Sequence, residues 1–383
     1  MKISDNIFYV GVNDHEIDLF EGQYVVPNGM AYNSYVIIDE KIAVMDSVDL
    51  RFADQWINNV KAVLGDRDPD YLIVQHMEPD HSSSIMKFTE CFKNATIVAS
   101  AKAFNMMKGF FGKDFADNRI IASEGDILSL GVRELKFITA PMVHWPEVIL
   151  TYDEYDKILF SADAFGKFGA LDVEEDWACE ARRYYFGIVG KYGAQVQALL
   201  KKAAGLDIRT ICSLHGPVLT ENLGYYLNLY DTWSGYRPET SGVCIAYASI
   251  YGNTKAAAEL LCDELTKRGV KVAISDLARC DMHEAIEDAF RYDRLVLASS
   301  TYNADVFPFM KEFINHLTER NYQNRRVAFI ENGSWAPMAT KVMKSMLEKS
   351  KNLTLAETEV KISSALSDDS RAEIIALAEE FSK

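Results

Sequence analysis

The run Val74-Gln75-His76-Met77-Glu78-Pro79-Asp80-His81 places two imidazoles and two carboxylates within six consecutive residues. An apolar, strand-like segment from Tyr71 to Val74 leads into it, and a helix-like segment that starts at Ser82 leads out. The backbone of a strand-to-helix turn need not be regular, so alternate side chains can converge on one centre. The run therefore predicts a metal site at the end of a strand. The plainer alternative is that Asp80 only caps the following helix.

Length and charge exclude several classes of protein. A chain of 383 residues suggests about two or three domains. Its formal net charge of −16 argues against non-specific binding to nucleic acid and against attraction to anionic membrane surfaces. No apolar run is long enough to span a bilayer, and the N-terminal residues lack a signal-peptide pattern. We expect a cytoplasmic protein that binds neither nucleic acid nor membrane.

The six cysteines are scattered, and none forms a C-x-x-C pair. This spacing disfavours a disulfide framework, a zinc ribbon or a built-in rubredoxin-type iron site. Reduced thiols in a cytoplasmic protein are the expectation. The residues are Cys91, Cys179, Cys212, Cys244, Cys262 and Cys280.

Three later strand-like segments are each followed by a further candidate ligand, and these ligands are His144, Asp163 and His215. Taken singly, such a histidine is more often a structural residue, and Asp163 can cap a turn before Gly166. Ligand sites in layered α/β folds gather at strand ends, however, so the shared placement favours one site. The acidic stretch from Asp46 to Asp49 either caps the helix that follows or hydrogen-bonds the site from behind.

The polar stretch from Tyr236 to Gly242 contains Pro and Gly and has no periodicity. We place a domain boundary there, which divides the chain into residues 1–240 and 241–383. Beyond the boundary, five strand-like segments alternate with five helix-like segments. That alternation predicts a doubly wound, open parallel sheet.

The loop Ser249-Ile250-Tyr251-Gly252-Asn253-Thr254 joins the first of these strands directly to a helix. Such a turn offers free backbone amides to an anion. It lacks the lysine of a triphosphate loop and the three glycines of a dinucleotide loop. The hydroxyls of Ser249 and Thr254 instead suit a terminal monophosphate. The alternative is a plain turn in which Thr254 is the N-cap.

Two more loops follow the third and fourth strands of this half. Their aromatic residues, Tyr302 and Trp335, can sandwich a flat ring, although either one alone is more often a packing residue. The candidate binding residues in these loops are Ser300, Thr301, Tyr302, Asn303, Ala304, Asn332, Gly333, Ser334 and Trp335.

These motifs together resemble the flavodiiron proteins, or A-type flavoproteins, over essentially the whole chain. The resemblance rests on H-x-E-x-D-H with later His, Asp and His, on S-x-x-G-N-T, and on S-T-Y-N-A. It implies an N-terminal metallo-β-lactamase-like αββα sandwich. A flavodoxin-like doubly wound sheet of strand order 2-1-3-4-5 should follow. The implied cofactors are FMN and two non-haem iron ions.

The resemblance also implies roles for individual residues. One iron is held by His76, Glu78 and His144, and the other by Asp80, His81 and His215, with Asp163 as the bridge. Hydrolases of the related fold carry a histidine where this chain has Glu78 and bind zinc, whereas added carboxylate suits non-haem iron. The last flavin loop departs from the glycine-rich G-S-Y-G-W run that is frequent in relatives. Trp335 is still the expected ring contact.

The implied activity is reduction of dioxygen to water, of nitric oxide to nitrous oxide, or of both. The implied partners are a rubredoxin-like electron donor and a second copy of the chain in a head-to-tail homodimer, or a tetramer. Two other classes stay open. One is a zinc hydrolase with an attached flavodoxin-like domain, and the other is a non-catalytic redox-carrier flavoprotein. Metal content and gas consumption separate the three.

Overall fold

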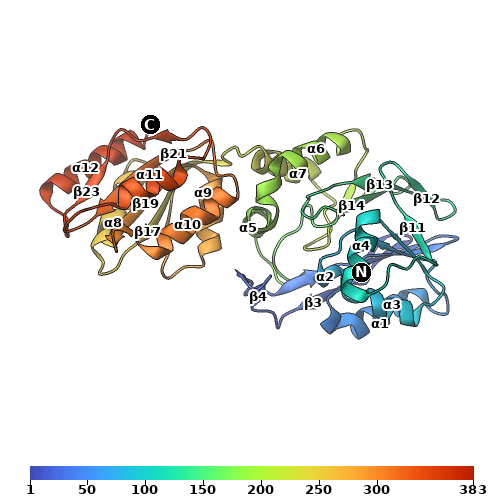
Figure 1. The fold of residues 1–383 in the computed structure, drawn as a ribbon. Helices are drawn as coiled ribbons and strands as arrows, with labels where there is room; N and C mark the ends of the chain where they lie inside the picture. The colour runs from blue at the N-terminus through green and yellow to red at the C-terminus, as the bar shows by residue number, and fades with distance from the viewer. The chain divides into compact units, whose positions relative to one another are not determined.

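The computed structural model describes residues 1–383, which form two compact units (Figure 1). The first unit comprises Met1–Tyr185 and Ala194–Asp231, and the second comprises Phe186–Gly193 and Thr232–Lys383. The short segment Phe186–Gly193 thus belongs to a different unit from the residues on either side of it. Among the helices, none combines the length and the apolar character needed to cross a membrane.

The first unit contains a seven-stranded sheet of order β1-β2-β7-β8-β9-β10-β11. Strands β7 and β8 form an antiparallel hairpin, and β9 to β11 continue in parallel from β8. The strands are β1 (Lys2–Ser4), β2 (Ile7–Tyr9), β7 (Tyr35–Ile38), β8 (Ile42–Met45), β9 (Tyr71–Val74), β10 (Thr96–Ala99) and β11 (Arg119–Ile121). The predicted strand before the His76–His81 turn is therefore β9.

A second, five-stranded sheet in this unit has the order β12-β13-β14-β15-β16. Its strands are β12 (Ile127–Ser129), β13 (Glu134–Thr139), β14 (Ile149–Asp153), β15 (Ile158–Phe160) and β16 (Thr210–Cys212). Because β14 is antiparallel to β13 and to β15, and β16 is parallel to β15, strands β13, β15 and β16 point the same way. Their carboxyl ends meet at one edge of the sheet, which brings the segments after them together.

The two sheets pack face to face around a shared apolar core. Alternate residues of each strand point into it, for example Ile73 of β9 and Val98 of β10 from one sheet, and Phe137 of β13 and Phe160 of β15 from the other. The intervening residues, such as Leu72 and Val74, are equally buried on the opposite face. Strands buried on both faces read as continuous apolar runs rather than as alternating ones.

Helices cover the outer faces of both sheets (Figure 1). Trp56 of α1 stacks on Phe88 of α3 and donates a hydrogen bond to Ser34 before β7. Val196 of α6 and Leu227 of α7 line an apolar gap against β14 and β15. The helices are α1 (Ala53–Leu64), α2 (Pro79–Ser82), α3 (Ile85–Cys91), α4 (Ala101–Phe111), α5 (Trp177–Tyr184), α6 (Gly193–Ala203) and α7 (Leu223–Ser234). The predicted αββα sandwich is confirmed.

Four short strands of the first unit form two small two-stranded sheets. Strand β3 (Val12–Asp14) pairs with β6 (Met30–Tyr32), and β4 (Leu19–Phe20) pairs with β5 (Tyr24–Val25). Between α5 and α6 the chain forms a π-helix over Tyr185–Val189 and a 3-10 turn over Gly190–Tyr192.

The second unit is built on a parallel sheet of order β18-β17-β19-β21-β22, which confirms the 2-1-3-4-5 order. Its strands are β17 (Thr240–Ala248), β18 (Val272–Asp276), β19 (Tyr292–Tyr302), β21 (Arg326–Asn332), β22 (Thr354–Leu355) and β23 (Val360–Ile362). The fifth strand is split, because β22 and β23 both pair with β21. A short strand β20 (Asp305–Val306) pairs antiparallel with the end of β19.

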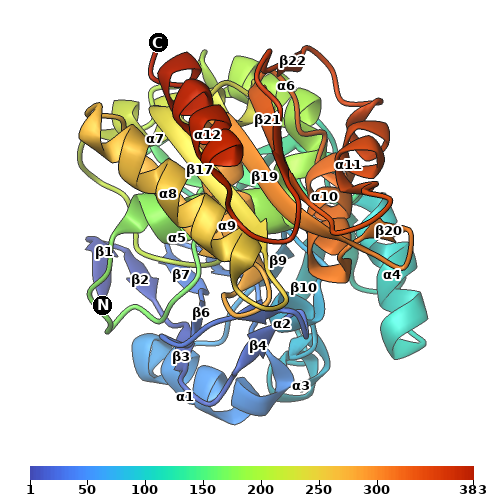
Figure 2. The same cartoon turned by 90° about the vertical axis from the view of Figure 1, so that its left-hand side faces the viewer.

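Five helices cover this sheet (Figure 2). Helices α8 (Asn253–Lys267) and α12 (Asp368–Glu380) pack together on one face, where Leu261 and Leu377 join the core. Helix α10 (Pro308–Glu319) packs against both α9 (Met282–Arg291) and α11 (Ala339–Leu347). In a parallel sheet of this kind the loops after β17, β19 and β21 gather at the carboxyl edge.

Candidate metal centre and phosphate-binding cavity

The turn after β9 delivers its four candidate ligands from irregular backbone. Glu78 occupies the N-cap position of α2, Pro79 is the first helical residue, and Asp80 and His81 lie within the short helix. Both carboxylate oxygens of Asp80 are buried and accept no hydrogen bond. The alternative in which Asp80 is only a helix cap is therefore wrong.

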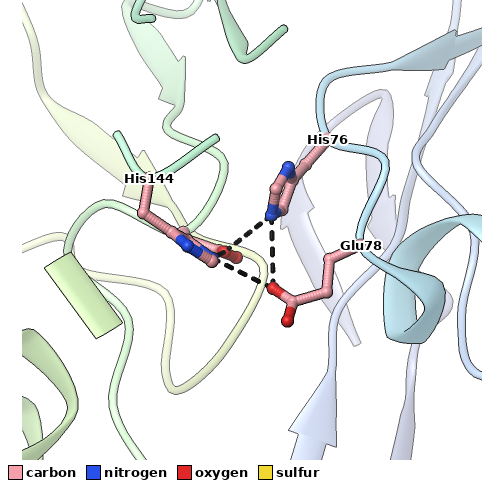
Figure 3. Close-up of side chains that lie close together, drawn as sticks. His76, Glu78 and His144 are labelled. Carbon is pink, nitrogen blue, oxygen red and sulfur yellow. Dashed lines mark hydrogen bonds and ion pairs between the residues drawn. The ribbon is translucent and has the colours of Figure 1, made fainter. Parts of the chain in front are cut away.

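One group of ligand atoms converges around Glu78. Its Oε2 lies 3.3 Å from Nε2 of His76 and 3.0 Å from Nε2 of His144, and the three side chains point toward one another (Figure 3). Oδ2 of Asp163 lies 3.2 Å from Nε2 of His76 and 3.1 Å from Nε2 of His144. Two imidazoles and two carboxylates thus face a common point.

A second group lies on the other side of Asp163. Oδ2 of Asp80 is 3.2 Å from Nε2 of His81 and 3.3 Å from Nε2 of His215. Oδ1 of Asp163 lies 3.5 Å from Nε2 of His81 and 3.7 Å from Nε2 of His215. Each oxygen of the Asp163 carboxylate therefore faces one group, which is the geometry of a bridging ligand.

The two groups fit a pair of metal cations. Both oxygens of Asp163 are buried and accept no hydrogen bond, although imidazole nitrogens lie within 3.7 Å. These atoms therefore face shared points rather than bonding to one another. Nδ1 of His215 donates to the Ala31 carbonyl at 2.7 Å, which leaves its Nε2 as an electron-pair donor. Four imidazoles with three carboxylates form a donor set that suits non-haem iron.

Charge in the pocket is consistent with this fit. Burial opposes ionisation of Asp163, but the imidazoles of His76, His144 and His81 outweigh it and hold the pKa of Asp163 well below its ordinary range. Burial and Asp80 oppose ionisation of Glu78, yet His144 and His76 lower its pKa to about 2. The carboxylates are therefore anionic at neutral pH. The same contacts raise the pKa values of His76 and His144, so a bound cation would take the place of the imidazole protons.

Residues behind the ligands hold the turn in place. Asp46 accepts hydrogen bonds from the backbone N–H groups of Gln75 at 2.7 Å and His76 at 3.3 Å. Asp49 instead caps the 3-10 turn Leu50–Phe52 through the N–H of Arg51. The hydrogen bonds from behind the site are thus made by Asp46, whereas the predicted helix α1 has no side-chain cap and Asp49 caps only the 3-10 turn before it.

Sequence reasoning missed Glu147. Its Oε1 accepts the Nδ1–H of His76 at 2.8 Å and the backbone N–H of Met77 at 2.9 Å. No periodicity marks this residue, and its only signal is its nearness to His144 in the chain.

Aromatic side chains wall the pocket beside His215. The rings of Phe20, Tyr184 and Tyr32 lie 5.4, 5.5 and 6.1 Å from its imidazole, measured between centroids. Burial, followed by the charges of Asp163 and the other carboxylates, raises the pKa of Tyr184 well above its ordinary value. The Tyr184 hydroxyl is buried and has no hydrogen-bond partner.

The second unit carries a cavity of ≈ 510 Å³ at the carboxyl edge of its sheet. Its lining is Ser249, Ile250, Tyr251, Asn253, Thr254, Ser300, Thr301, Asn303, Ala304, Asn332, Gly333, Ser334, Trp335, Ala336 and Ser364. All three predicted loops therefore meet at one cavity. Of the predicted residues, Gly252 and Tyr302 lie outside the lining, while Ala336 and Ser364 are additions that the sequence did not indicate.

One end of the cavity suits a phosphate. Gly252 precedes α8 with a φ of 94°, a conformation that favours glycine, and no side chain caps the helix. Thr254 is inside the helix, and its hydroxyl lies 3.3 Å from that of Ser300, so the N-cap alternative for Thr254 is wrong. The uncapped first-turn amides remain available to an anion.

The rest of the cavity suits a flat ring. Trp335 is 83% exposed and Tyr251 is 93% exposed, so two bare aromatic side chains border the cavity. Tyr302 instead packs edge-on against Phe307, with ring centroids 5.5 Å apart. A ligand with one phosphate and one planar ring, such as FMN, matches this division of the lining.

Comparisons with known proteins agree with the two-part fold. A family model described as "ODP family beta lactamase" matches residues 30–216, and the flavodoxin model matches residues 245–369. A nitric oxide reductase of Moorella thermoacetica is 30% identical over 369 residues, which cover 93% of this chain and 92% of the relative.

Two solved structures share the whole fold. Rubredoxin:oxygen oxidoreductase from the anaerobe Desulfovibrio gigas is 23% identical with a TM-score of 0.92, covering 100% of this chain and 97% of that one. The flavodiiron protein of Giardia intestinalis is 25% identical with a TM-score of 0.91, covering 99% and 96%. The chain therefore belongs to the flavodiiron protein family.

Proposed function

We propose that the protein reduces dioxygen to water, nitric oxide to nitrous oxide, or both, at a diiron centre that receives electrons from FMN. The observation that carries the proposal is the Asp163 carboxylate, whose two oxygens each face a separate group of nitrogen and oxygen ligands. The names of the relatives, a nitric oxide reductase and an oxygen oxidoreductase, support the two substrates.

Residue roles follow from this geometry. His76, Glu78 and His144 hold one iron, Asp80, His81 and His215 hold the other, and Asp163 bridges them. FMN occupies the cavity of the second unit, with its phosphate at the loop from Ser249 to Thr254 and its ring beside Trp335. We divide the chain into a diiron domain of residues 1–240 and an FMN-binding domain of residues 241–383.

When bound, two ferrous ions and reduced FMN supply the electrons that the reduction of either gas requires. Asp163 fixes the separation of the two cation sites. Phe20 and Tyr32 are almost fully buried beside His215, so they limit water access and lower the local dielectric. The unpartnered hydroxyl of Tyr184 is a hydrogen-bond donor that can stabilise the negative charge that the substrate gains as it is reduced.

Replacing Tyr184 by phenylalanine should lower turnover about tenfold, because a hydrogen bond to a charged group contributes ~1.5 kcal/mol. Iron content should not change, because the ring and its packing remain. Steady-state gas consumption and metal analysis measure both quantities. Tyr152→Phe is the matched control, since it loses a hydrogen bond to the Asp207 carbonyl instead. Equal losses in the two variants would refute the assigned role.

The experiment that tests the function uses one photoreduced, iron-replete sample of the full chain in parallel dioxygen and nitric oxide electrodes. We expect two irons and one FMN per chain and consumption of at least one gas. Zinc without iron, together with ester or thioester hydrolysis, would favour the hydrolase alternative. A reduced, iron-loaded protein that consumes neither gas would favour the redox-carrier alternative.

Removing the exposed indole should weaken FMN binding. Trp335→Ala is expected to raise the Kd about tenfold, because stacking on an aromatic side chain contributes ~1–3 kcal/mol per ring. Quenching of FMN fluorescence on titration into flavin-free protein measures the Kd. Tyr155→Ala, an exposed aromatic of the first unit, should leave it unchanged. Parallel Tyr251→Ala and Tyr302→Ala variants identify the second stacking ring.

Partners belong to the same proposal. A rubredoxin-like protein is the electron donor, as the name of the Desulfovibrio gigas relative suggests. The chain acts as a head-to-tail homodimer, or as a tetramer, and mass measurement in solution tests this, because a fully active monomer contradicts it. All six cysteines are free thiols, which supports a cytoplasmic location.

A further inference from the structure

Three of the four candidate imidazole ligands differ in what their Nδ1 contacts on the side away from the metal pocket. His76 donates its Nδ1–H to the Glu147 carboxylate at 2.8 Å. His215 donates to a neutral backbone carbonyl, that of Ala31, at 2.7 Å. Nδ1 of His81 is buried and has no partner. Among these three rings, only that of His76 is hydrogen-bonded to a negatively charged group through its Nδ1.

The charge on Glu147 is directed at this ring. Its side chain is fully buried and forms no ion pair with lysine or arginine. Oε1 accepts both the imidazole N–H of His76 and the backbone N–H of Met77, while Oε2 has no partner. In a low-dielectric interior such an unscreened charge acts strongly on its immediate neighbour. That neighbour is the ring whose Nε2 faces Glu78 and Asp163.

We propose that Glu147 is a positioning residue that makes the two irons unequal, so that the iron on His76, Glu78 and His144 holds its ferric state more strongly. A carboxylate that accepts the Nδ1 proton increases the basicity of the ligating nitrogen and fixes its tautomer. A more basic imidazole stabilises the more highly charged ion. Neither His81 nor His215 is hydrogen-bonded to a carboxylate through its Nδ1. The inference rests on the residue roles assigned in the proposed function.

Glu147→Gln separates charge from shape. The glutamine carbonyl can accept the same two N–H groups, so the variant keeps the side-chain size and both hydrogen bonds and loses only the negative charge. The FMN cavity lies in the other unit, so FMN content reports on the second unit only, and thermal unfolding followed by near-UV circular dichroism reports whether the first unit still folds.

The test is a redox titration of the ⁵⁷Fe-loaded holoprotein, followed by Mössbauer spectroscopy, which counts ferric and ferrous ions at each site. In Glu147→Gln we expect the ferric preference of the iron on His76, Glu78 and His144 to fall about tenfold. That change corresponds to a rise of about 59 mV in its one-electron midpoint. The other iron should shift much less. A chelator competition should also show about 10–100-fold weaker metal retention, a typical loss when the outer partner of a metal-bound histidine is mutated.

Asp46→Asn is the matched control. It removes another buried charge from behind the same turn, but Asp46 hydrogen-bonds N–H groups of Gln75 and His76 and no imidazole. The imidazole on which its charge acts is His81, in the other ligand group. The difference between the two midpoints should therefore persist in this variant. If Glu147→Gln does not hold iron, Glu147→Asp is used instead. Its side chain is one methylene shorter, so it keeps the charge but places it farther from His76, and the midpoint of the iron on His76 should rise by a smaller amount.

The outcomes separate this inference from the proposed function. A wild-type protein that holds no iron pair overturns both. A wild-type protein with an active iron pair leaves the function standing. In that case, Glu147→Gln midpoints that are unchanged, or that shift equally at both irons, overturn the role of Glu147.

Discussion

Replacing Asp163 by asparagine is expected to empty at least one of the two iron sites and to lower gas turnover by a factor of at least ~100. Asp163 alone faces both ligand groups, with one carboxylate oxygen toward each. An amide can offer one neutral oxygen, so the variant loses the bridge and one of the three negative charges in the pocket. Loss of an outer partner alone typically costs 10–100-fold in metal affinity or activity, and a shared ligand should matter more.

The protein should still fold without this carboxylate. The Asp163 side chain accepts no hydrogen bond, and the turn it begins is held by a backbone bond from Gly166 N–H to the Asp163 carbonyl at 3.0 Å. Metal analysis measures iron per chain, gas electrodes measure oxygen and nitric oxide consumption, and FMN absorbance measures the flavin content. Asp172→Asn, an exposed carboxylate on the same loop, is the control. A variant with two irons and normal turnover would contradict the bridging role.

The convergence of the candidate ligands was predictable because it depends on strand direction. Apolar runs before the His76 turn and before His144, Asp163 and His215 mark strands that end next to these residues. Strands β13, β15 and β16 run the same way, so their carboxyl ends meet at one edge. The assignment of ligands to two separate irons came from the family resemblance. The spacing alone did not provide it.

Which aromatic residue borders the flavin cavity was not predictable from the loop sequence. Asn303 and Ala304 both have positive φ, 52° and 57°, and form a two-residue turn that pairs Tyr302 with Asp305. This hairpin places Tyr302 against Phe307, outside the lining. A one-residue change of register or turn type reverses the facing of a side chain, and no local pattern fixed that choice here.

Glu147 was unpredictable for another reason. Its two hydrogen bonds reach residues about 70 positions earlier in the chain, and they form only once the two sheets of the first unit pack together. Ser364 likewise reaches the flavin cavity through the loop after β23, where it hydrogen-bonds Ser334 at 2.6 Å. Tertiary contacts of this kind leave no periodic signal in the sequence.

Glu78→His is expected to lower the iron content of one site and to cut gas turnover by a factor of about 100, while zinc retention rises. The Glu78 carboxylate lies within 3.3 Å of both His76 and His144 and is held ionised, with a pKa of about 2. The substitution replaces this anionic oxygen by a neutral nitrogen, which leaves three imidazoles and Asp163 around that cation. Imidazole-rich sites suit zinc, and zinc has no redox chemistry.

Metal analysis after growth with equal iron and zinc measures the change in selectivity, and gas electrodes measure turnover. Glu90→His is the matched control, because Glu90 is exposed on α3 and the chemical change is the same. FMN content should be normal in both variants, since the flavin cavity belongs to the other unit. If Glu78→His retains two irons and full turnover, the carboxylate is not what selects iron. Selectivity would then have to come from Asp80 and the Asp163 bridge, because they are the other carboxylates in the pocket.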